Sequence, residues 1–209
     1  MLTQEEWMGA LNARHGKERQ EKFSRAVVAV CGLGGLGSNV AIALARAGIG
    51  KLILIDFDRV DVTNLNRQQY KASQLGMNKT EALAQNLREI NPFIRLETHA
   101  VRISEENAQE LLQEADVVCE AFDVPEAKAM LVNFVLENMP EKYLVAGSGM
   151  AGFESPNTIQ TRRITGRFYL CGDTVSDVND GIGLVCARVM VCAAHEAHTI
   201  LRLLANEIE

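Results

Sequence analysis

The chain has 209 residues, and 21 lysines and arginines stand against 27 aspartates and glutamates, for a formal net charge of −6. With 47% apolar and 23% charged residues, this is the balance of an ordinary soluble globular protein. The acidic charge argues against nucleic acid or a membrane surface as a partner. The length predicts a single domain over residues 1–209, with residues 1–24 as a helical N-terminal arm and no room for a separate catalytic domain.

Neither end of the chain carries a recognisable membrane or export segment. The longest apolar stretch, residues 184–194, contains Arg188 and is well short of the roughly 20 residues that a membrane span needs. The first 22 residues lack the apolar core of a signal peptide. The five cysteines are an odd number without a CxxC pair, which favours reduced thiols over disulfides or a cysteine-rich zinc site. We therefore expect a cytoplasmic protein.

The first elements in chain order are helical and then alternate between strand and helix. Residues 3–23 are polar with widely spaced apolar positions, which predicts one or two short amphipathic helices. An apolar run over 26–30, a glycine cluster and a small-residue helix ending at Gly48 follow, and then a second apolar run over 52–55. This order predicts strand, loop, helix and strand. Apolar strands separated by helices are typical of a parallel sheet covered on both faces.

The alternation continues through the middle of the chain. We expect Pro92 to end one helix, because the residue before proline avoids helical geometry, and Ser104 to begin another as its N-cap. The predicted elements are a helix over 78–90, a strand over 95–101, a helix over 104–113, a strand over 116–122, a helix over 125–139 and a strand over 143–146. The fold class is therefore α/β, a Rossmann-like doubly wound and mostly parallel sheet.

The pattern changes after Gly147. Residues 158–164 and 167–170, separated by a Thr-Gly pair, predict an antiparallel hairpin appended to the sheet. Residues 172–183 are acidic and glycine-bearing, and we expect a mobile loop there. A C-terminal helix over 184–206 would then bury most of its surface. It would present one polar stripe, made of Arg188, His195, Thr199, Arg202 and Asn206.

A glycine-rich loop between the first strand and its helix is the strongest local signal. Residues 32–37 read GLGGLG, which matches GxGxxG in the context where glycines let the backbone approach a phosphate at a helix N-terminus. Asp56 ends the second strand, where an acidic residue would bind ribose hydroxyls. The loop predicts nucleotide binding through Gly32, Gly34, Gly35 and Gly37. The alternatives are a tight turn without a ligand, and a nicotinamide or flavin dinucleotide as the ligand.

The polar residues that follow Asp56 argue against a dehydrogenase function. Asn64, Arg67 and Gln68 cluster within five positions, and the second half of the chain offers no convincing histidine with a carboxylate partner for hydride transfer. Lys79 lies in the first turn of a helix, where a cation opposes the helix dipole, so we expect an anion to need it. A solvated surface is the plain alternative for Arg67 and Lys79. A non-catalytic nucleotide-binding scaffold, and an NAD-dependent oxidoreductase, remain alternatives for the whole chain.

These segments carry a family resemblance. The segments GLGGLGSNVAIALARAGIG, IDFDRVDVTNLNRQQY, GMNK and CEAFD resemble the ThiF family of adenylyltransferases, which are relatives of molybdopterin-synthase adenylyltransferase and of ubiquitin-activating enzymes. The likeness runs from about Arg14 to the C-terminal helix. Within the family, FDRVDVTNLNRQQY and SGMAGF look most similar to the short thiamine-biosynthesis branch that activates the sulfur carrier ThiS.

The resemblance implies a reaction and roles for particular residues. It implies that the C-terminal Gly-Gly carboxylate of a small ubiquitin-like carrier attacks the α-phosphate of ATP, forming an acyl-adenylate and releasing pyrophosphate. The glycine loop would approach the phosphates, Asp56 would hold the ribose, and Asp123 would hold Mg²⁺. The residues implied to contact the triphosphate are Asn64, Arg67, Gln68 and Lys79.

The resemblance also implies partners and leaves alternatives. Arg14 would act as a catalytic arginine reaching the site of a neighbouring subunit, which implies a homodimer, although the segment after it is shorter than in most relatives. The chain lacks the two CxxC pairs with which longer relatives bind zinc, so we expect none. Cys171 is the candidate thiol for sulfur transfer. Other acceptors within the family, the molybdopterin-synthase small subunit or a modified tRNA base, stay open.

Overall fold

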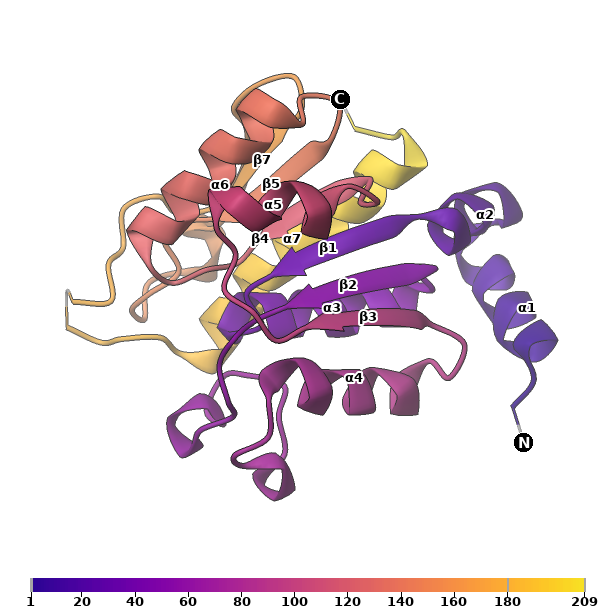
Figure 1. Cartoon of the computed structure of the whole chain (residues 1–209), viewed down its shortest axis with the longest axis horizontal. Coiled ribbons are helices and arrows are strands. Elements are labelled where there is room, and N and C mark those ends of the chain that lie inside the picture. The colour runs from indigo at the N-terminus through magenta and orange to yellow at the C-terminus, as the bar shows by residue number, and fades with distance from the viewer. Residues whose placement is uncertain (1, 180, 209) are drawn as a thin grey trace.

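A computed structural model describes residues 2–179 and 181–208, in which helices alternate with the strands of one sheet (Figure 1). The helices are α1 (Gln4–His15), α2 (Lys17–Arg25), α3 (Gly35–Ala47), α4 (Lys79–Ile90), α5 (Glu105–Leu112), α6 (Pro125–Asn138) and α7 (Cys186–Ala205). The strands are β1 (Val27–Cys31), β2 (Lys51–Ile55), β3 (Arg95–His99), β4 (Val117–Glu120), β5 (Tyr143–Gly147), β6 (Gln160–Arg163) and β7 (Phe168–Gly172). Single 3₁₀ turns cover Val62–Asn64, Ala72–Gln74 and Pro156–Thr158.

The sheet has the order β3-β2-β1-β4-β5-β7-β6. Every neighbouring pair is parallel except β6 and β7, whose antiparallel hairpin is the predicted appendage. The chain order reverses beside β1, which pairs with β2 on one side and β4 on the other. In such sheets a crevice opens outside the carboxyl ends of the strands at the point of reversal. The predicted doubly wound fold is confirmed, and it places the segments after β1 and β4 at that crevice.

Helices cover both faces of the sheet (Figure 1). Alternate β1 residues point to opposite faces, so Val28 and Val30 pack with α3, α4 and α7, whereas Ala29 and Cys31 pack with α5 and α6. The two layers account for the almost continuously apolar strands, because a strand covered on both faces has no side for polar side chains. No described helix is long and apolar enough to cross a membrane.

Two helix ends, at Gly48 and Ser104, form where the sequence predicts them. Gly48 follows α3 at φ +80°, a left-handed conformation that favours glycine. Ser104 is the N-cap of α5, and its backbone N–H donates to Asn107 Oδ1 at 2.8 Å. The third strand is shorter than predicted. It ends at His99, which pairs with Ile55, the last residue of β2, so the ladder has no partner for further residues.

The polar stripe predicted on the C-terminal helix is only partly correct. Arg188 and Thr199 are each 5% exposed, and Asn206 lies beyond the helix as its left-handed C-cap. The charge of Arg188 suggested a solvent-facing position, but its guanidinium is enclosed by backbone carbonyls and a carboxylate.

Candidate nucleotide-binding site

The glycine loop leaves β1 and enters α3 in a conformation that requires glycine. Gly32 lies at φ +90°, and a Cβ built there would be 2.8 Å from the carbonyl oxygen of Ala121, so the loop after β1 touches the loop after β4. A Cβ on Gly37 would collide with the carbonyl oxygen of Gly32. A Cβ on Gly34, the N-cap of α3, would meet only Gln68 Nε2, at 3.8 Å. The backbone at Gly34 is therefore open to a ligand.

Asp56 faces this loop from the end of β2. Its side chain is 7% exposed, with Oδ2 accepting the Leu33 N–H at 2.6 Å and Oδ1 accepting the Asp58 N–H at 2.8 Å. Each carboxylate oxygen keeps a second lone pair that a ribose hydroxyl could use. The structure thus brings Asp56 and the glycine loop together, as the spacing predicted.

Lys79 enters the same region from the first turn of α4. It is 5% exposed, and its ammonium lies 2.8 Å from Asp58 Oδ2 and 3.9 Å from Asp56 Oδ2. The anion expected from the sequence is therefore supplied within the chain by Asp58, a role that the sequence did not reveal. The ammonium has three N–H donors, so this pairing leaves it capacity to bind a phosphate as well.

Arg67 and Gln68 border the glycine loop from the segment after β2. The aliphatic part of Arg67 lies against Gly35, where a Cβ would be 3.6 Å from Arg67 Cδ and Cγ. Among the described residues, the buried Arg67 Nε and Gln68 Oε1 have no hydrogen-bond partner. Buried polar atoms are nearly always paired in folded proteins, so two orphans beside one loop indicate a place for a polar ligand.

Three further polar side chains hold this segment in shape. Asn64 Oδ1 accepts the Asp61 N–H at 2.9 Å. The Asn64 carbonyl accepts the N–H groups of Arg67, at 3.2 Å, and Gln68, at 2.9 Å. Asn39 Nδ2 donates to the carbonyls of Gly35 (2.7 Å) and Arg67 (3.1 Å). Tyr70 Oη donates to the Leu33 carbonyl at 2.7 Å. Asn39 and Tyr70 lie inside the recognised motifs, but residue type alone did not assign them this role.

Asp123 follows β4 at the same edge of the sheet. It is exposed and has no polar partner among the described residues. The preceding Phe122 is fixed at both backbone groups: its N–H donates to Glu120 Oε1 at 2.7 Å, and its carbonyl accepts from Lys128 at 3.1 Å. Burial raises the pKa of Glu120, against the opposing effect of Lys128 at 2.7 Å. An unpaired carboxylate on this fixed loop, beside the glycine loop, has the chemistry to bind Mg²⁺.

Arg14 does not join these residues within one chain. It is exposed on α1, which lies beyond the start of β1, whereas the glycine loop lies beyond its end (Figure 1). Leu11 of the same helix packs at Gly48, at the amino edge of the sheet. Within one chain, the structure does not bring Arg14 to the glycine loop.

The candidate sulfur-transfer thiol is enclosed. Cys171 lies on β7 with no exposed surface, and burial raises its pKa to about 12. A thiol that stays protonated and covered is a poor nucleophile. Cys186, at the start of α7, is the partly exposed cysteine, with Sγ 3.8 Å from Met190 Sδ.

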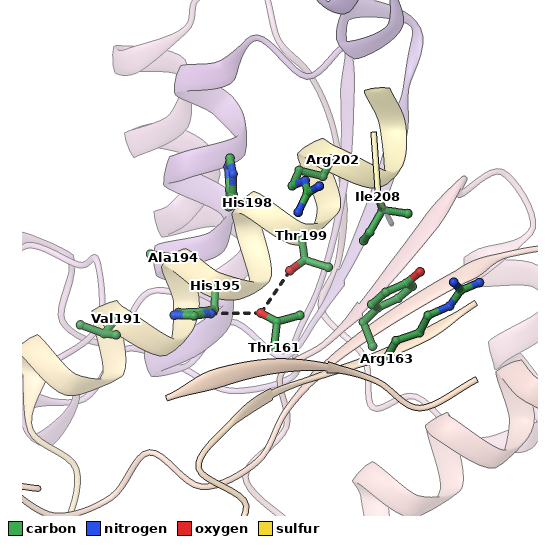
Figure 2. Close-up of a pocket in the computed structure, with 10 residues that line it drawn as sticks. Thr161, Arg163, Val191, Ala194, His195, His198, Thr199, Arg202 and Ile208 are labelled. Carbon is green, nitrogen blue, oxygen red and sulfur yellow. Dashed lines mark hydrogen bonds between the residues drawn. The ribbon is translucent and has the colours of Figure 1, made fainter. Parts of the chain in front are cut away.

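A separate pocket of about 630 Å³ opens between α7 and the edge strand β6. Figure 2 shows Thr161 of β6 directed towards His195 and Thr199 of α7, at 3.0 Å and 3.5 Å. None of its lining residues belongs to the group around the glycine loop. In the described part of the chain, no three His, Cys, Asp or Glu side chains lie close enough together to form a metal site of protein ligands alone.

The chain matches the ThiF family over residues 9–207. It is 35% identical over 203 residues to adenylyltransferase and sulfurtransferase UBA4 of Lodderomyces elongisporus, covering 92% of this chain and 43% of that protein. It is 38% identical over 131 residues to the sulfur carrier protein adenylyltransferase of Thermus thermophilus, covering 62% of this chain and 43% of that one. The chain therefore spans less than half the length of these two relatives.

Solved structures agree with the fold. The E. coli tRNA N6-threonylcarbamoyladenosine dehydratase TcdA, in complex with ATP, superposes with a TM-score of 0.87 at 25% identity, covering 99% of this chain and 98% of that one. The same protein in complex with AMP gives the same score. The family match covers both the glycine loop and the segment that carries Arg67. The chain belongs to the ThiF family.

Proposed function

We propose that this chain uses Mg-ATP to adenylate the C-terminal Gly-Gly carboxylate of a ubiquitin-like sulfur-carrier protein. The observation that carries the proposal is the pair of buried polar atoms without described partners, Arg67 Nε and Gln68 Oε1, beside the open backbone of Gly34. The names of the relatives as adenylyltransferases and the ATP complex of TcdA support it. A nicotinamide oxidoreductase would leave Arg67, Lys79 and Asp123 without a task.

The chemistry matches what the site offers. A carboxylate is already a nucleophile at neutral pH, so the reaction needs positioning and charge neutralisation rather than a general base. One carboxylate oxygen bonds to the α-phosphorus, and the bond from that phosphorus to the oxygen bridging the β-phosphate breaks. The electron pair leaves with pyrophosphate. Mg²⁺ held by Asp123 would neutralise negative charge on the phosphates.

Different residues of the site would bind the phosphates, bind the ribose and stabilise the developing charge. The N-terminus of α3 has N–H groups without helical partners, and these would bind phosphate oxygens through the glycine loop. Asp56 would accept the ribose hydroxyls. Arg67 and Lys79 would stabilise charge that develops on the leaving phosphates, a task for cations fixed beforehand by Asn66 and Asp58. Asn64 and Gln68 would complete the contacts to the triphosphate.

We also propose a homodimer in which Arg14 completes the neighbouring site. Helix α1, which carries Arg14, lies at the amino edge of the sheet and away from the glycine loop of its own chain, which supports a contribution to a second copy. A planar guanidinium binds phosphate oxygens with two parallel hydrogen bonds, which suits a clamp supplied by a second subunit.

For the acceptor we propose a ThiS-like carrier in thiamine thiazole synthesis, in the cytoplasm, where the five free cysteines would stay reduced. Its extended tail would lie under the described part of the predicted loop, residues 172–179 and 181–183, since residue 180 lies outside the described residues, and beside residues 150–153. If that channel is too narrow for side chains, only glycine passes. Replacing both tail glycines by alanine should then abolish adenylation, and full activity with the alanine tail would contradict this specificity.

The product itself provides the test. An acyl-adenylate reacts with hydroxylamine to give a hydroxamate, which mass spectrometry detects on the carrier's C-terminus. We expect the hydroxamate only when ATP, Mg²⁺, the enzyme and an intact Gly-Gly tail are all present. A carrier whose last residue is removed serves as the matched control. Equal hydroxamate from that control would contradict activation of the terminal carboxylate.

A second candidate is adenylation of a modified tRNA base. The observation that favours it is coverage, because TcdA matches 99% of this chain and 98% of its own length, whereas the two curated relatives are matched over 43% of theirs. The acidic net charge of −6 opposes a polyanionic substrate. ATP consumption that depends on tRNA, and not on any Gly-Gly carrier, would select this candidate.

A further inference from the structure

Arg188 and Asp173 form an ion pair that is buried on both sides. Arg188 lies in the first turn of α7, and Asp173 follows β7 directly. Arg188 Nη2 donates to Asp173 Oδ2 at 2.6 Å, and both side chains are 5% exposed. Withdrawing two charges from water is unfavourable unless further hydrogen bonds satisfy them. The pair is outside the group around the glycine loop, so that group does not explain it.

The guanidinium uses its remaining donors on one segment. That segment connects β5 to β6 and includes residues 150–153, proposed above to border the carrier tail. Arg188 donates through Nε to the carbonyl of Ala151 at 3.0 Å, through Nη1 to the carbonyls of Glu154 (3.1 Å) and Ser155 (2.8 Å), and through Nη2 to Thr158 Oγ1 at 3.0 Å. A single side chain thus fixes residues 151–158 by four hydrogen bonds.

Asp173 fixes the second segment. Its Oδ1 accepts the backbone N–H groups of Val175 and Ser176, both at 2.9 Å, and the Ser176 hydroxyl at 3.1 Å. Burial acts to raise the pKa of Asp173, but these hydrogen bonds and the one from Arg188 together lower it. Ser176 Oγ in turn accepts the Ala151 N–H at 3.1 Å. The start of the 172–183 loop is therefore tied both to α7 and to residues 151–158.

The joined segments present apolar side chains to solvent. Phe153 is 78% exposed and Val175 is 81% exposed, and Ile182 further along the loop is 60% exposed. The backbones also meet directly, because the Gly152 N–H donates to the Gly183 carbonyl at 3.0 Å. Apolar side chains exposed on these adjoining segments offer a surface that another chain could cover.

The same turn of α7 also contacts the glycine loop. Val189, the neighbour of Arg188, has its Cγ1 3.0 Å from the position of a Cβ on Gly35. Helix α7 therefore contacts the glycine loop through one residue and holds residues 151–158 through the next. This arrangement sets the distance between the glycine loop and the apolar segments.

We propose that Arg188, with Asp173, is a positioning residue for the acceptor. The pair clamps residues 151–158 and 173–176 into one wall for the acceptor's C-terminal tail, at a fixed distance from the glycine loop. This inference rests on the proposed function, because it assigns the wall to the adenylated chain. It gives the pair no contact with ATP, so loss of the clamp should impair use of the acceptor and leave ATP binding intact.

The test compares KM values for the carrier and for ATP in Arg188→Met, Arg188→Lys and the double variant Arg188→Met/Asp173→Asn. A single removal strands a buried charge and can unfold the chain, whereas the double variant removes both charges. We expect the double variant to raise the carrier KM by about 10-fold or more, since small misplacements of a reactant have large effects, with the ATP affinity unchanged. Arg188→Lys should lie between that variant and the wild type.

Lys51→Met is the matched control. It removes two ion pairs, to Glu97 and to Glu114, at the start of β2 and outside both segments, and it should leave both KM values unchanged. A folded double variant with the wild-type carrier KM would overturn the clamp. So would an equal loss of carrier use and ATP affinity, because the pair would then support the whole fold.

Hydrogen exchange separates failure of the clamp from failure of the proposed function. In the double variant, amide exchange should accelerate in residues 151–158 and 173–176 and stay at the wild-type rate around the glycine loop. Uniform acceleration would contradict the clamp whatever the acceptor is. A wild-type protein that activates no Gly-Gly carrier would instead contradict the proposed function, and with it the assignment of the wall to that acceptor.

Discussion

The side chain of Arg67 lies against Gly35, with Cδ 3.6 Å from the position that a Cβ there would occupy. Its Nη1 is anchored to the Thr63 carbonyl (3.0 Å) and to Asn66 Oδ1 (2.9 Å), while Nε has no described partner. The guanidinium is thus held beside the glycine loop, and no carboxylate among the described residues pairs with it. An unneutralised cation fixed beside a glycine loop is suited to binding a phosphate chain.

Replacing Arg67 should therefore slow the chemistry more than it weakens the fold. We expect Arg67→Ala to lower the turnover number by about 10² to 10³, the usual effect of removing one fixed donor to developing charge. Arg67→Lys should recover only part, because an ammonium lacks the planar fork. Arg88→Ala, which removes an exposed arginine on α4, is the control. Steady-state kinetics measure the effect, and wild-type turnover in Arg67→Ala would remove this residue from the mechanism.

Asp123→Ala should abolish turnover without unfolding the chain. The carboxylate is exposed and has no described partner, so its loss should change the free energy of unfolding by less than about 0.5 kcal/mol. Activity titrated with Mg²⁺ and a thermal melt provide the two measurements. Glu126→Ala, an exposed acid in the first turn of α6, is the matched control. Ordinary Mg²⁺-dependent turnover in Asp123→Ala would mean that another group holds the metal.

Two alanine substitutions in the glycine loop should affect different properties: one should weaken ATP binding, and the other should destabilise the fold. Gly34→Ala places a methyl group in open space, 3.8 Å from Gln68 Nε2, so the chain should fold normally while ATP affinity falls by about 10-fold, the equivalent of 1.4 kcal/mol. Gly32→Ala forces a side chain into a φ of +90° and against the Ala121 carbonyl, and should destabilise the fold by about 1–3 kcal/mol. Equilibrium ATP binding and denaturant unfolding distinguish the two. Undiminished ATP affinity in Gly34→Ala would place the phosphates elsewhere.

Glu196 should make stability depend on pH. It is completely buried in α7 against Gly147, neither carboxylate oxygen has a described partner, and burial raises its pKa. The native chain then keeps this proton at pH values where the unfolded chain has lost it. Stability should fall with rising pH above the unfolded value near 4.3, by up to about 1.4 kcal/mol per pH unit, until the native group ionises.

The variant Glu196→Gln cannot ionise and should lose this part of the pH dependence. Urea unfolding of both proteins between pH 5 and pH 8 measures the difference, in which the contribution of Glu120 cancels. The variant should gain stability relative to the wild type as pH rises. Parallel curves would show that Glu196 has the same pKa in both states.

The fold was predictable because its signals are local and periodic. The apolar strands, the stop at Gly48 and the cap at Ser104 each depend on a few neighbouring residues, and the structure has all three. The third strand was predicted to reach Val101, which is apolar but lies beyond the residues that pair with β2. Strand ends are set by the partner, which local sequence does not show.

The candidate site was predictable where motifs are contiguous and not where partners are distant. The motifs predicted that Asp56, Arg67 and the glycine loop lie close together, and they do so in the structure. Two ion pairs were not predicted: Asp58 pairs with Lys79, 21 positions away, and Asp173 pairs with Arg188 inside the protein. A charged residue in a helix pattern is assigned to solvent unless its partner is known.

ATP–pyrophosphate exchange by the purified protein, measured with and without a ubiquitin-like carrier that ends in Gly-Gly, tests carrier adenylation directly. Exchange reports reversible formation of an adenylate and requires no later step. We predict exchange that depends on the carrier and is lost in Arg67→Ala and Lys79→Ala. A protein that binds ATP but shows no exchange with any such carrier would contradict carrier adenylation.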